Sequence, residues 1–313
     1  MRNRAERWIF AAGTPERLAA LRIGLCAVLT WRLTRGVFVD LAGQPAELFR
    51  PRSFMNLFSS QPDRGWVLAA QIAGIAAGAL ATVGLFARAT LPVAWAAGML
   101  LNGMVTSNGK IMHNDVLLLL CLVPLLIAPT ADAWSLDAWR KGSRGSASVR
   151  YGWPVRTALL VVVGAYFFTG FAKLVTAGPA WATSSNMRWV LYLSSDSQAS
   201  PNPFALFVAD RAWLAHLVAA ATLLLELSFP VVLWRSRLRP AYALGAAGLH
   251  GGIWLAMRLD YFAMAATAVI VLIDRPAVPP RGRNARGGRP GPYPLSKYEP
   301  FSRAGSESPA GDG

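Results

Sequence analysis

The stretch Tyr166-Phe-Phe-Thr-Gly-Phe-Ala-Lys173-Leu places a lysine near the end of an apolar run of membrane length that begins around Val155. A cation is costly in hydrocarbon, so a charged residue in such a run usually serves a specific purpose. A desolvated lysine also loses its proton readily, and the neutral amine is a base. Two histidines, His113 and His250, lie in or beside other apolar runs. The sequence therefore raises the question of whether these three residues meet.

The composition is that of an integral membrane protein. The 313 residues are 54% hydrophobic and 15% charged, and the mean hydropathy is +0.37. Soluble domains carry about 25% charged residues, so the deficit and the long apolar runs indicate an all-α integral membrane protein. A chain of this length holds about eight transmembrane helices of ~20 residues each. We expect them at residues 18–38, 66–86, 89–106, 115–129, 154–175, 212–234, 240–257 and 259–274.

The distribution of basic residues predicts an orientation. The net charge of +15 does not indicate nucleic-acid binding, because the 31 basic residues are scattered through loops and the C-terminal segment. Basic residues accumulate in the cytoplasmic loops of membrane proteins, and most of the 31 fall on the side of the predicted helices that includes the N-terminus. We therefore predict a multi-pass protein of the cell membrane, in contact with membrane lipid and with both termini in the cytoplasm.

The chain divides into two predicted regions. Residues 1–275 form a multi-helix transmembrane domain, and residues 276–313 form a disordered, basic cytoplasmic tail, because this segment has too few apolar side chains to fold. Cys26 and Cys121 lie inside separate apolar runs, so we interpret them as buried apolar residues and not as a disulfide or metal pair. The three histidines lack the spacing of a metal site, and we predict no metal.

The predicted topology brings polar residues from separate helices to the non-cytoplasmic side. His113, Asn114 and Asp115 lie at the outer start of the fourth predicted helix, and Lys173 lies near the outer end of the fifth. His250 lies near the middle of the seventh. Such a convergence is a signal of a binding or catalytic cavity.

Helical spacing adds candidate residues for binding a cofactor. Tyr166, Thr169 and Lys173 stand at positions i, i+3 and i+7, so they share one face of a helix. His250 and Trp254 share a face of another helix, which combines a polar group with an aromatic wall. A face of this kind suits a planar apolar ring such as a quinone, so Tyr166, Thr169 and Trp254 are the predicted cofactor-binding residues.

Each candidate also has a structural interpretation. Lys173 near the end of its run can extend its amine to the membrane interface. His250 lies among glycines, where close helix packing and one interhelical hydrogen bond would account for it. The group at His113 can be the start of a helix whose free N–H groups are capped. Glu226 is predicted to form a structural ion pair with Arg22, which lies at a comparable depth.

Three blocks of sequence carry a resemblance to a known family. They are Asn108-Gly-Lys-Ile-Met-His113-Asn-Asp-Val, the stretch ending at Lys173-Leu with Gly178-Pro-Ala-Trp181 after it, and Leu223-Leu-Leu-Glu226-Leu with Gly248-Leu-His250-Gly-Gly-Ile. In these blocks the chain resembles the vitamin K-dependent gamma-carboxylase superfamily, the horizontally transferred transmembrane (HTTM) domain proteins. The resemblance covers roughly residues 15–275.

The resemblance implies a catalytic role for three residues. Lys173 would be the base toward reduced vitamin K or menaquinol, His113 would assist that lysine, and His250 would lie near the substrate. In the carboxylase, oxygen reacts with the quinol to give a strong base that removes a γ proton from a glutamate. Carbon dioxide then adds to the glutamate, and the quinone leaves as its epoxide. The resemblance therefore implies a carboxylase-like lyase that acts on a peptide or small molecule on the non-cytoplasmic side.

A non-enzymatic function remains the alternative. The animal carboxylase has a large luminal region that helps to bind its protein substrate, and this sequence contains no region that corresponds to it. The alternative is a membrane protein of the same fold that binds lipid or peptide, or that supports peptide maturation or export. A desolvated Lys173 beside His113 would favour the enzyme, because acid–base partners act within hydrogen-bond reach.

Overall fold

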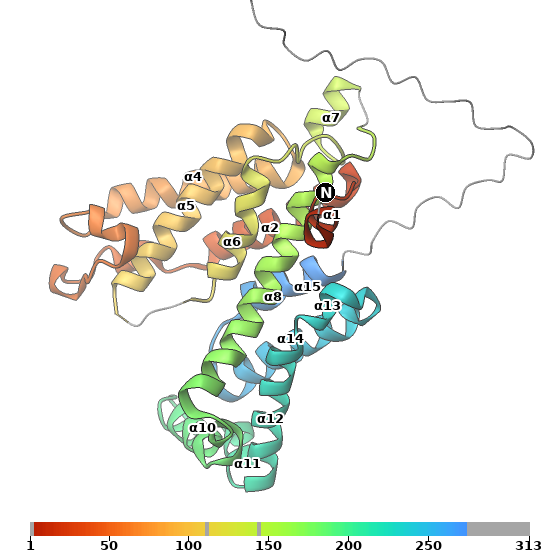
Figure 1. The fold of residues 1–313 in the computed structure, drawn as a ribbon. Helices are drawn as coiled ribbons and strands as arrows, with labels where there is room; N and C mark the ends of the chain where they lie inside the picture. Colours follow the sequence, from red (N-terminus) through yellow and green to blue (C-terminus); the bar gives the residue numbers. More distant parts are fainter. Residues whose placement is uncertain (1–2, 110–112, 143–144, 274–313) are drawn as a thin grey trace, which may run out of the picture. The chain divides into compact units, whose positions relative to one another are not determined.

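The computed structural model describes residues 3–109, 113–142 and 145–273, and this part of the chain is built from helices without a β-strand (Figure 1). The eight predicted apolar segments correspond to α2 (Pro15–Arg35), α4 (Arg64–Val83), α5 (Ala87–Ser107), α6 (Val116–Leu126), α8 (Val149–Ala177), α12 (Ala212–Ser228), α14 (Arg239–Met257) and α15 (Phe262–Ile273). Short helices lie between or before them: α1 (Arg4–Ile9), α3 (Phe38–Leu41), η1 (Ala46–Leu48), η2 (Ser53–Leu57), α7 (Leu136–Lys141), α9 (Ala180–Thr183), α10 (Asn186–Asp196), α11 (Pro203–Ala209), α13 (Val231–Trp234) and η3 (Ser236–Leu238). The predicted all-α fold is confirmed for these residues, whereas the predicted tail, 276–313, lies outside them.

The number of membrane-crossing helices differs from the prediction of eight. Among the described residues, α4, α5 and α8 are long and apolar enough to cross a membrane, and α11 with α12 adds a fourth if that bent pair is one span. A spanning helix needs about 20 predominantly apolar residues, and α6 and α15 have only 11 and 12. Charged side chains such as Arg22 and Arg32 interrupt α2, and glycines together with His250 lower the hydropathy of α14.

Helices α2, α4, α5 and α6 form one group of neighbours (Figure 1). Asp63 caps the start of α4 by accepting hydrogen bonds from the N–H groups of Gly65 and Trp66. Gly84 ends α4 in the left-handed conformation, with φ of +71°, so that α5 can turn back along α4. A Cβ at Gly74 would lie only 2.8 Å from the Cβ of Ala97, which shows how closely α4 and α5 approach each other.

The 29 residues of α8 connect this group to a second one. A helix of this length extends about 43 Å, which exceeds the ~30 Å of a bilayer core. Its N-terminal half packs against α6, where the Cys121 thiol lies 3.8 Å from the carbonyl of Ala158. Its C-terminal half packs against α12 and α9. Residues near the C-terminus of α8 therefore belong to the second group.

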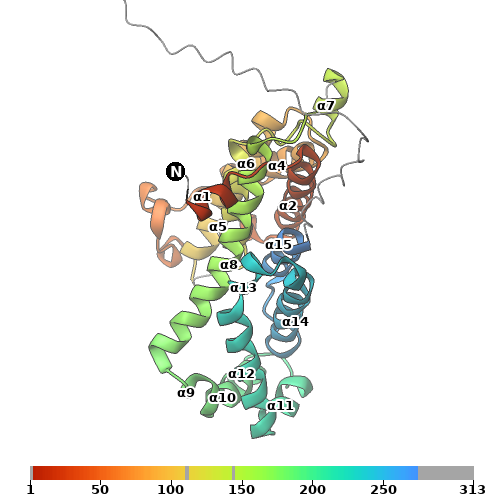
Figure 2. The same cartoon turned by 45° about the vertical axis from the view of Figure 1, so that its right-hand side comes forward.

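The second group consists of α8 and α12 with α14 and α15, and the short helices α9, α10 and α11 lie at one end of it (Figure 2). The axis of the chain bends by 98° between α11 and α12. Asn202 caps α11 by accepting hydrogen bonds from the N–H groups of Phe204 and Ala205. Asn202 also donates a hydrogen bond to the carbonyl of Ala256 near the end of α14, and two residues later Arg258 adopts a φ of +55° and begins a short turn into α15. Helices α14 and α15 therefore form a tight hairpin.

The interior is apolar, and both cysteines belong to it. Cys26 and Cys121 are fully buried and unpaired, as the sequence predicts. Helix α15 packs against α2, α6 and α8, and so joins the two groups of helices.

Candidate functional site

Lys173 and Glu226 form a close ion pair between α8 and α12. The Nζ atom of Lys173 lies 2.5 Å from both carboxylate oxygens of Glu226. Only 5% of the Glu226 side chain is exposed, compared with 22% of the Lys173 side chain. The ammonium also lies 4.7 Å from the centre of the Trp181 ring, within the range of a cation–π interaction. The pair is therefore shielded on the carboxylate side and accessible on the lysine side.

A glycine allows the two helices to approach closely enough for this pair. Gly170 stands three residues before Lys173, so the two residues share a face of α8. A Cβ at Gly170 would lie 2.7 Å from the Cβ of Glu226 and 3.2 Å from the backbone nitrogen of Leu227. Such distances require backbone movement, so only glycine fits without displacing α12. In the Gly-Phe-Ala-Lys sequence, Gly170 thus allows α8 and α12 to approach closely, and Lys173 pairs with Glu226 across that contact.

An open groove of about 580 Å³ lies beside the lysine. Its lining combines aromatic rings, methyl groups and two hydroxyl groups from α8 and α9, and consists of Phe168, Thr169, Ala172, Lys173, Thr176, Ala177 and Trp181. The volume falls in the range of ~300–1,000 Å³ that is typical of small-molecule sites. The groove therefore presents one charged group within an otherwise mostly apolar surface.

His250 forms a second polar contact inside the same group of helices. Its Nε2 lies 2.9 Å from the hydroxyl of Tyr166, and both side chains are buried. The Tyr166 ring stacks on Phe229 with 4.1 Å between ring centres. The Nδ1 atom of His250 is buried without a hydrogen-bond partner among the described residues. The His250 imidazole is thus hydrogen-bonded at Nε2, and its Nδ1 can form one further hydrogen bond.

Tyr261 lies between the two predicted histidines. Its ring centre is 5.4 Å from that of His113 and 5.6 Å from that of His250. The Tyr261 hydroxyl lies 3.4 Å from Nε2 of His113. Burial raises the pKa of Tyr261, which keeps its hydroxyl protonated at neutral pH. Tyr261 was not among the residues predicted from the sequence, although it is a polar aromatic residue at the start of the last apolar segment, directly before α15 begins at Phe262.

The sequence model of the HTTM domain matches residues 14–274, which is most of the chain. The chain belongs to the HTTM domain family. The resemblance seen in the sequence is thereby confirmed, and the family is related to the vitamin K-dependent carboxylases. No curated protein and no solved structure matches the chain.

The structure distributes the predicted site residues of this HTTM protein over four places. Lys173 pairs with Glu226, and Thr169 lines the groove beside it. Tyr166 instead points inward to His250. His113 contacts Tyr261. Trp254 is half exposed, and the guanidinium of Arg258 lies 4.9 Å from its ring centre. Although their spacing places Tyr166 and Thr169 near one face of α8, Tyr166 is buried against His250 and only Thr169 lines the groove.

The predicted ion pair of Arg22 with Glu226 is wrong. Glu226 pairs with Lys173, because α12 packs against α8. The Arg22 guanidinium donates hydrogen bonds to backbone carbonyls at helix ends and loops, at 2.5 Å to Thr130, 2.7 Å to Trp134 and 3.5 Å to Thr82. Arg22 and Glu226 lie at similar distances from the ends of their predicted transmembrane helices, but this similarity does not determine which helices are neighbours.

A network of charges fixes the turn that carries Tyr261. Arg32 on α2 binds both oxygens of Asp115, at 2.7 and 3.1 Å, and an oxygen of Asp260 at 2.7 Å. Asn114 donates a hydrogen bond to the carbonyl of Asp260. The predicted convergence of Asn114 and Asp115 with the turn after α14 is present, and Arg32 holds it together. This network positions Tyr261 next to His113.

Metal ligands do not gather in the part of the chain that the structure describes, where no three His, Cys, Asp or Glu residues are placed to hold an ion. The polar groups that the structure brings together here are a lysine, a carboxylate, two imidazoles and two phenols.

Proposed function

We propose that this HTTM protein is a carboxylase-like membrane enzyme that accepts a proton from a lipid-soluble quinol at Lys173. The observation that carries the proposal is the Lys173–Glu226 pair, which is buried on its carboxylate side and open to an apolar groove on its amine side. The opening gives a ligand access to the ammonium, which a purely structural ion pair does not require. The acceptor of the subsequent chemistry would be a peptide or small molecule on the non-cytoplasmic side.

The residues of the groove fit a reduced vitamin K or menaquinol. Trp181 and Phe168 offer aromatic surface, Ala172 and Ala177 add apolar contacts, and the Thr169 hydroxyl is available for a hydrogen bond. When bound, the quinol would supply an acidic hydroxyl and an oxidisable ring, whose reaction with oxygen is the source of the strong base in carboxylase chemistry. The groove supplies the apolar surroundings that exclude water.

The ion pair can hold a proton in two places. In an apolar site the charged pair is poorly solvated, so transfer of a proton from Nζ of Lys173 to Glu226, which gives a neutral amine and a neutral acid, costs less than it would in water. The neutral amine can then accept a proton from a hydroxyl in the groove. Glu226 therefore stores the proton that Lys173 releases, and this arrangement replaces the direct pairing with His113 expected from the sequence.

The histidines would serve the acceptor side of the reaction. His250 has an unpartnered Nδ1 and is oriented by Tyr166, so it can bind a polar group of the substrate. His113, through Tyr261, would modulate the polarity around His250. This assignment agrees with the role that the resemblance implies for His250, whereas it moves His113 from the lysine to the acceptor side.

Quinol turnover in detergent tests the proposal. Purified protein would receive reduced vitamin K or menaquinol with oxygen and bicarbonate, and the epoxide product would be quantified. We expect Lys173→Ala and Glu226→Gln each to lower the rate by at least about 100-fold, the usual contribution of a general base. His216→Gln, a histidine substitution on α12 outside the set, is the matched control and should retain the rate. A folded wild-type protein that binds quinol and forms no epoxide would contradict the enzymatic proposal.

The second candidate is a binding protein of the same fold. Lys173 already has a carboxylate partner at 2.5 Å, and this observation favours a structural pair beside a lipid- or peptide-binding groove. Quenching of tryptophan fluorescence by a quinone analogue distinguishes the two. Saturable quenching that depends on Trp181 and persists in Lys173→Ala, combined with no turnover, supports binding without chemistry.

A further inference from the structure

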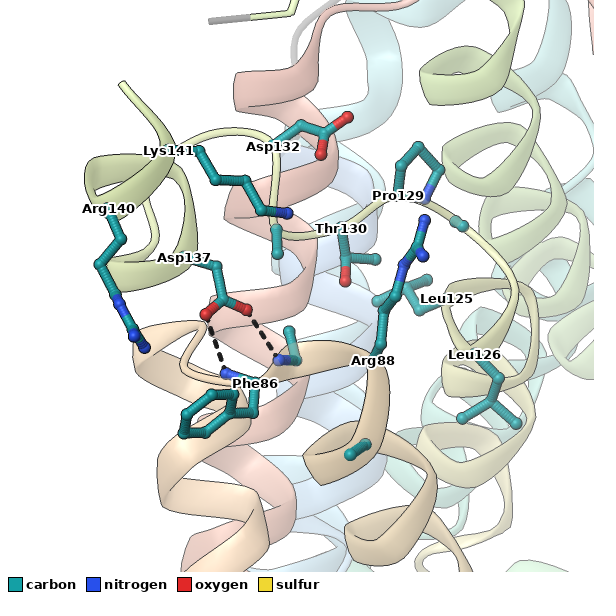
Figure 3. Close-up of a pocket in the computed structure, with 14 residues that line it drawn as sticks. Phe86, Arg88, Leu125, Leu126, Pro129, Thr130, Asp132, Asp137, Arg140 and Lys141 are labelled. Carbon is teal, nitrogen blue, oxygen red and sulfur yellow. Dashed lines mark hydrogen bonds between the residues drawn. The ribbon is translucent and has the colours of Figure 1, made fainter. Parts of the chain in front are cut away.

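A second pocket, of about 560 Å³, lies beside the N-terminal end of α8, whereas the lysine groove lies at the C-terminal end of that helix (Figure 1). It is formed by the N-terminus of α5, the C-terminus of α6, the loop that follows α6, and α7 (Figure 3). Its floor is apolar and includes Leu125, Leu126 and Pro129. Three cations, Arg88, Arg140 and Lys141, line its walls. The pocket thus combines an apolar base with a concentration of positive charge.

The two carboxylates in this pocket are already engaged. Asp137 accepts hydrogen bonds of 3.0 Å from the backbone N–H groups of Phe86 and Ala87, at the start of α5 (Figure 3). A carboxylate in this position neutralises the positive end of the helix. Asp132 accepts a hydrogen bond of 2.7 Å from the hydroxyl of Tyr151 and lies 3.4 Å from Arg150. Neither aspartate pairs with a cation that lines the pocket.

The three cations remain without a carboxylate partner among the described residues. Arg140 lies 5.5 Å from the centre of the Phe86 ring, which leaves its N–H donors available. Arg88 lies in the first turn of α5, where a cation is electrostatically unfavourable unless an anion compensates it. In Figure 3, Lys141 and Arg88 point from opposite sides toward the loop that carries Thr130. Arg88 and Lys141 therefore border a space that an anion can occupy, and Arg140 adds a positive charge to the lining of the same pocket.

We propose that this pocket binds the phosphate of an anionic phospholipid headgroup. Arginine binds phosphate through paired N–H donors, and lysine adds a compact positive charge. The apolar floor suits the glycerol and first acyl carbons of a lipid better than it suits a free ion. The basic residues also lie on the side that the charge distribution predicts to be cytoplasmic, where basic pockets between membrane helices bind anionic headgroups. The predicted topology explains why basic residues are numerous on this side. A bound anion explains why three of them line one pocket.

Lipid binding to the purified full-length protein tests this site. The protein in neutral detergent would be titrated with phosphatidylglycerol, with phosphatidylcholine, and with inorganic phosphate as separate probes, and binding would be followed by the rise in unfolding temperature. We expect saturable stabilisation by phosphatidylglycerol and at least a tenfold weaker affinity in the triple variant Arg88→Gln, Arg140→Gln, Lys141→Gln. The matched control carries glutamine at Arg4, Arg235 and Arg237, three exposed arginines outside the pocket, and should bind within about threefold of wild type.

Three outcomes would overturn the proposal. Equal weakening in both triple variants would indicate attraction by overall charge. Equal stabilisation by the two phospholipids would remove the preference for an anionic headgroup. Stabilisation by inorganic phosphate at the concentrations at which phosphatidylglycerol acts would assign the pocket to a free anion. The single variants Arg88→Gln and Lys141→Gln, each expected to weaken binding several-fold, keep the test valid if the triple variant does not fold.

Discussion

Arg22 and Lys173 are both cations within apolar helices, and their surroundings differ. Arg22 is fully buried, and its guanidinium donates to three backbone carbonyls from the α4 end and the loop after α6. Lys173 keeps part of its side chain exposed, faces a groove and pairs with a carboxylate that can take up its proton. The comparison teaches that burial of a charge does not by itself mark a functional site. A better indication of a functional site is a charged group that a ligand can reach and whose partner can exchange a proton with it.

The largest effect is expected from removing the inaccessible cation. Arg22→Met should leave carbonyls of Thr130 and Trp134 without their charged donor and lower the free energy of unfolding by about 3–5 kcal/mol. Thermal unfolding in detergent, followed by near-ultraviolet circular dichroism, measures this loss. Arg35→Met, an exposed position in the last turn of the same helix, is the control and should change little. An Arg22→Met protein as stable as the control would mean that this arginine is dispensable to the fold.

A smaller loss is expected when the accessible cation loses its partner. Glu226→Leu should destabilise the protein by about 1–3 kcal/mol, because Lys173 then lacks a counter-charge in an apolar site but can still reach outward through the groove. The double variant Lys173→Met, Glu226→Leu should recover most of that loss while remaining inactive. Unfolding temperatures of the two single variants and the double variant measure the coupling. Additive losses would show that the two residues do not act as a pair.

The smallest effect concerns the helix contact that supports the pair. Gly170→Ala should cost about 1–2 kcal/mol, since the new methyl group would meet the Cβ of Glu226 at 2.7 Å and push α12 away from α8. Gly248→Ala is the matched control, because nothing lies within 4 Å of a Cβ at that position. The control should be neutral or slightly stabilising, as expected for alanine in a helix. If both variants unfold at the same temperature, the close approach at Gly170 is not limiting.

The sequence was sufficient to predict the helices. Each predicted apolar segment contains a helix, because a long apolar run satisfies its backbone hydrogen bonds most simply in that form, even where α5, α6 and α8 contain a proline. The number of helices that are long and apolar enough to cross a membrane was harder to predict from the sequence. Helix α6 ends at Leu126, earlier than its apolar run suggested, and α12 is followed by a separate turn at α13. A proline lies shortly after each of these ends, at Pro129 and Pro230, and an average of hydropathy does not detect it.

The candidate site was predictable in its members but not in its pairings. Lys173, His250 and His113 stood out because polar groups in apolar runs are rare. The partner of Glu226 depends on which helix α12 packs against, and a single sequence does not contain that information. The role of Arg32 was also missed, because its two partners, Asp115 and Asp260, lie in segments far apart in the chain. Interhelical contacts of this kind arise from the rotation of each helix about its axis.

The groove beside Lys173 opens along the flank of α8, where Phe168 and Val175 present large exposed apolar side chains. A molecule that reaches the lysine by this route arrives sideways from the hydrocarbon layer. The quantity that governs its supply is then its mole fraction among the surrounding lipids, and the aqueous concentration matters only through partitioning. Diluting the substrate with additional lipid at constant total volume should slow occupancy of the groove, whereas adding buffer at constant lipid should not.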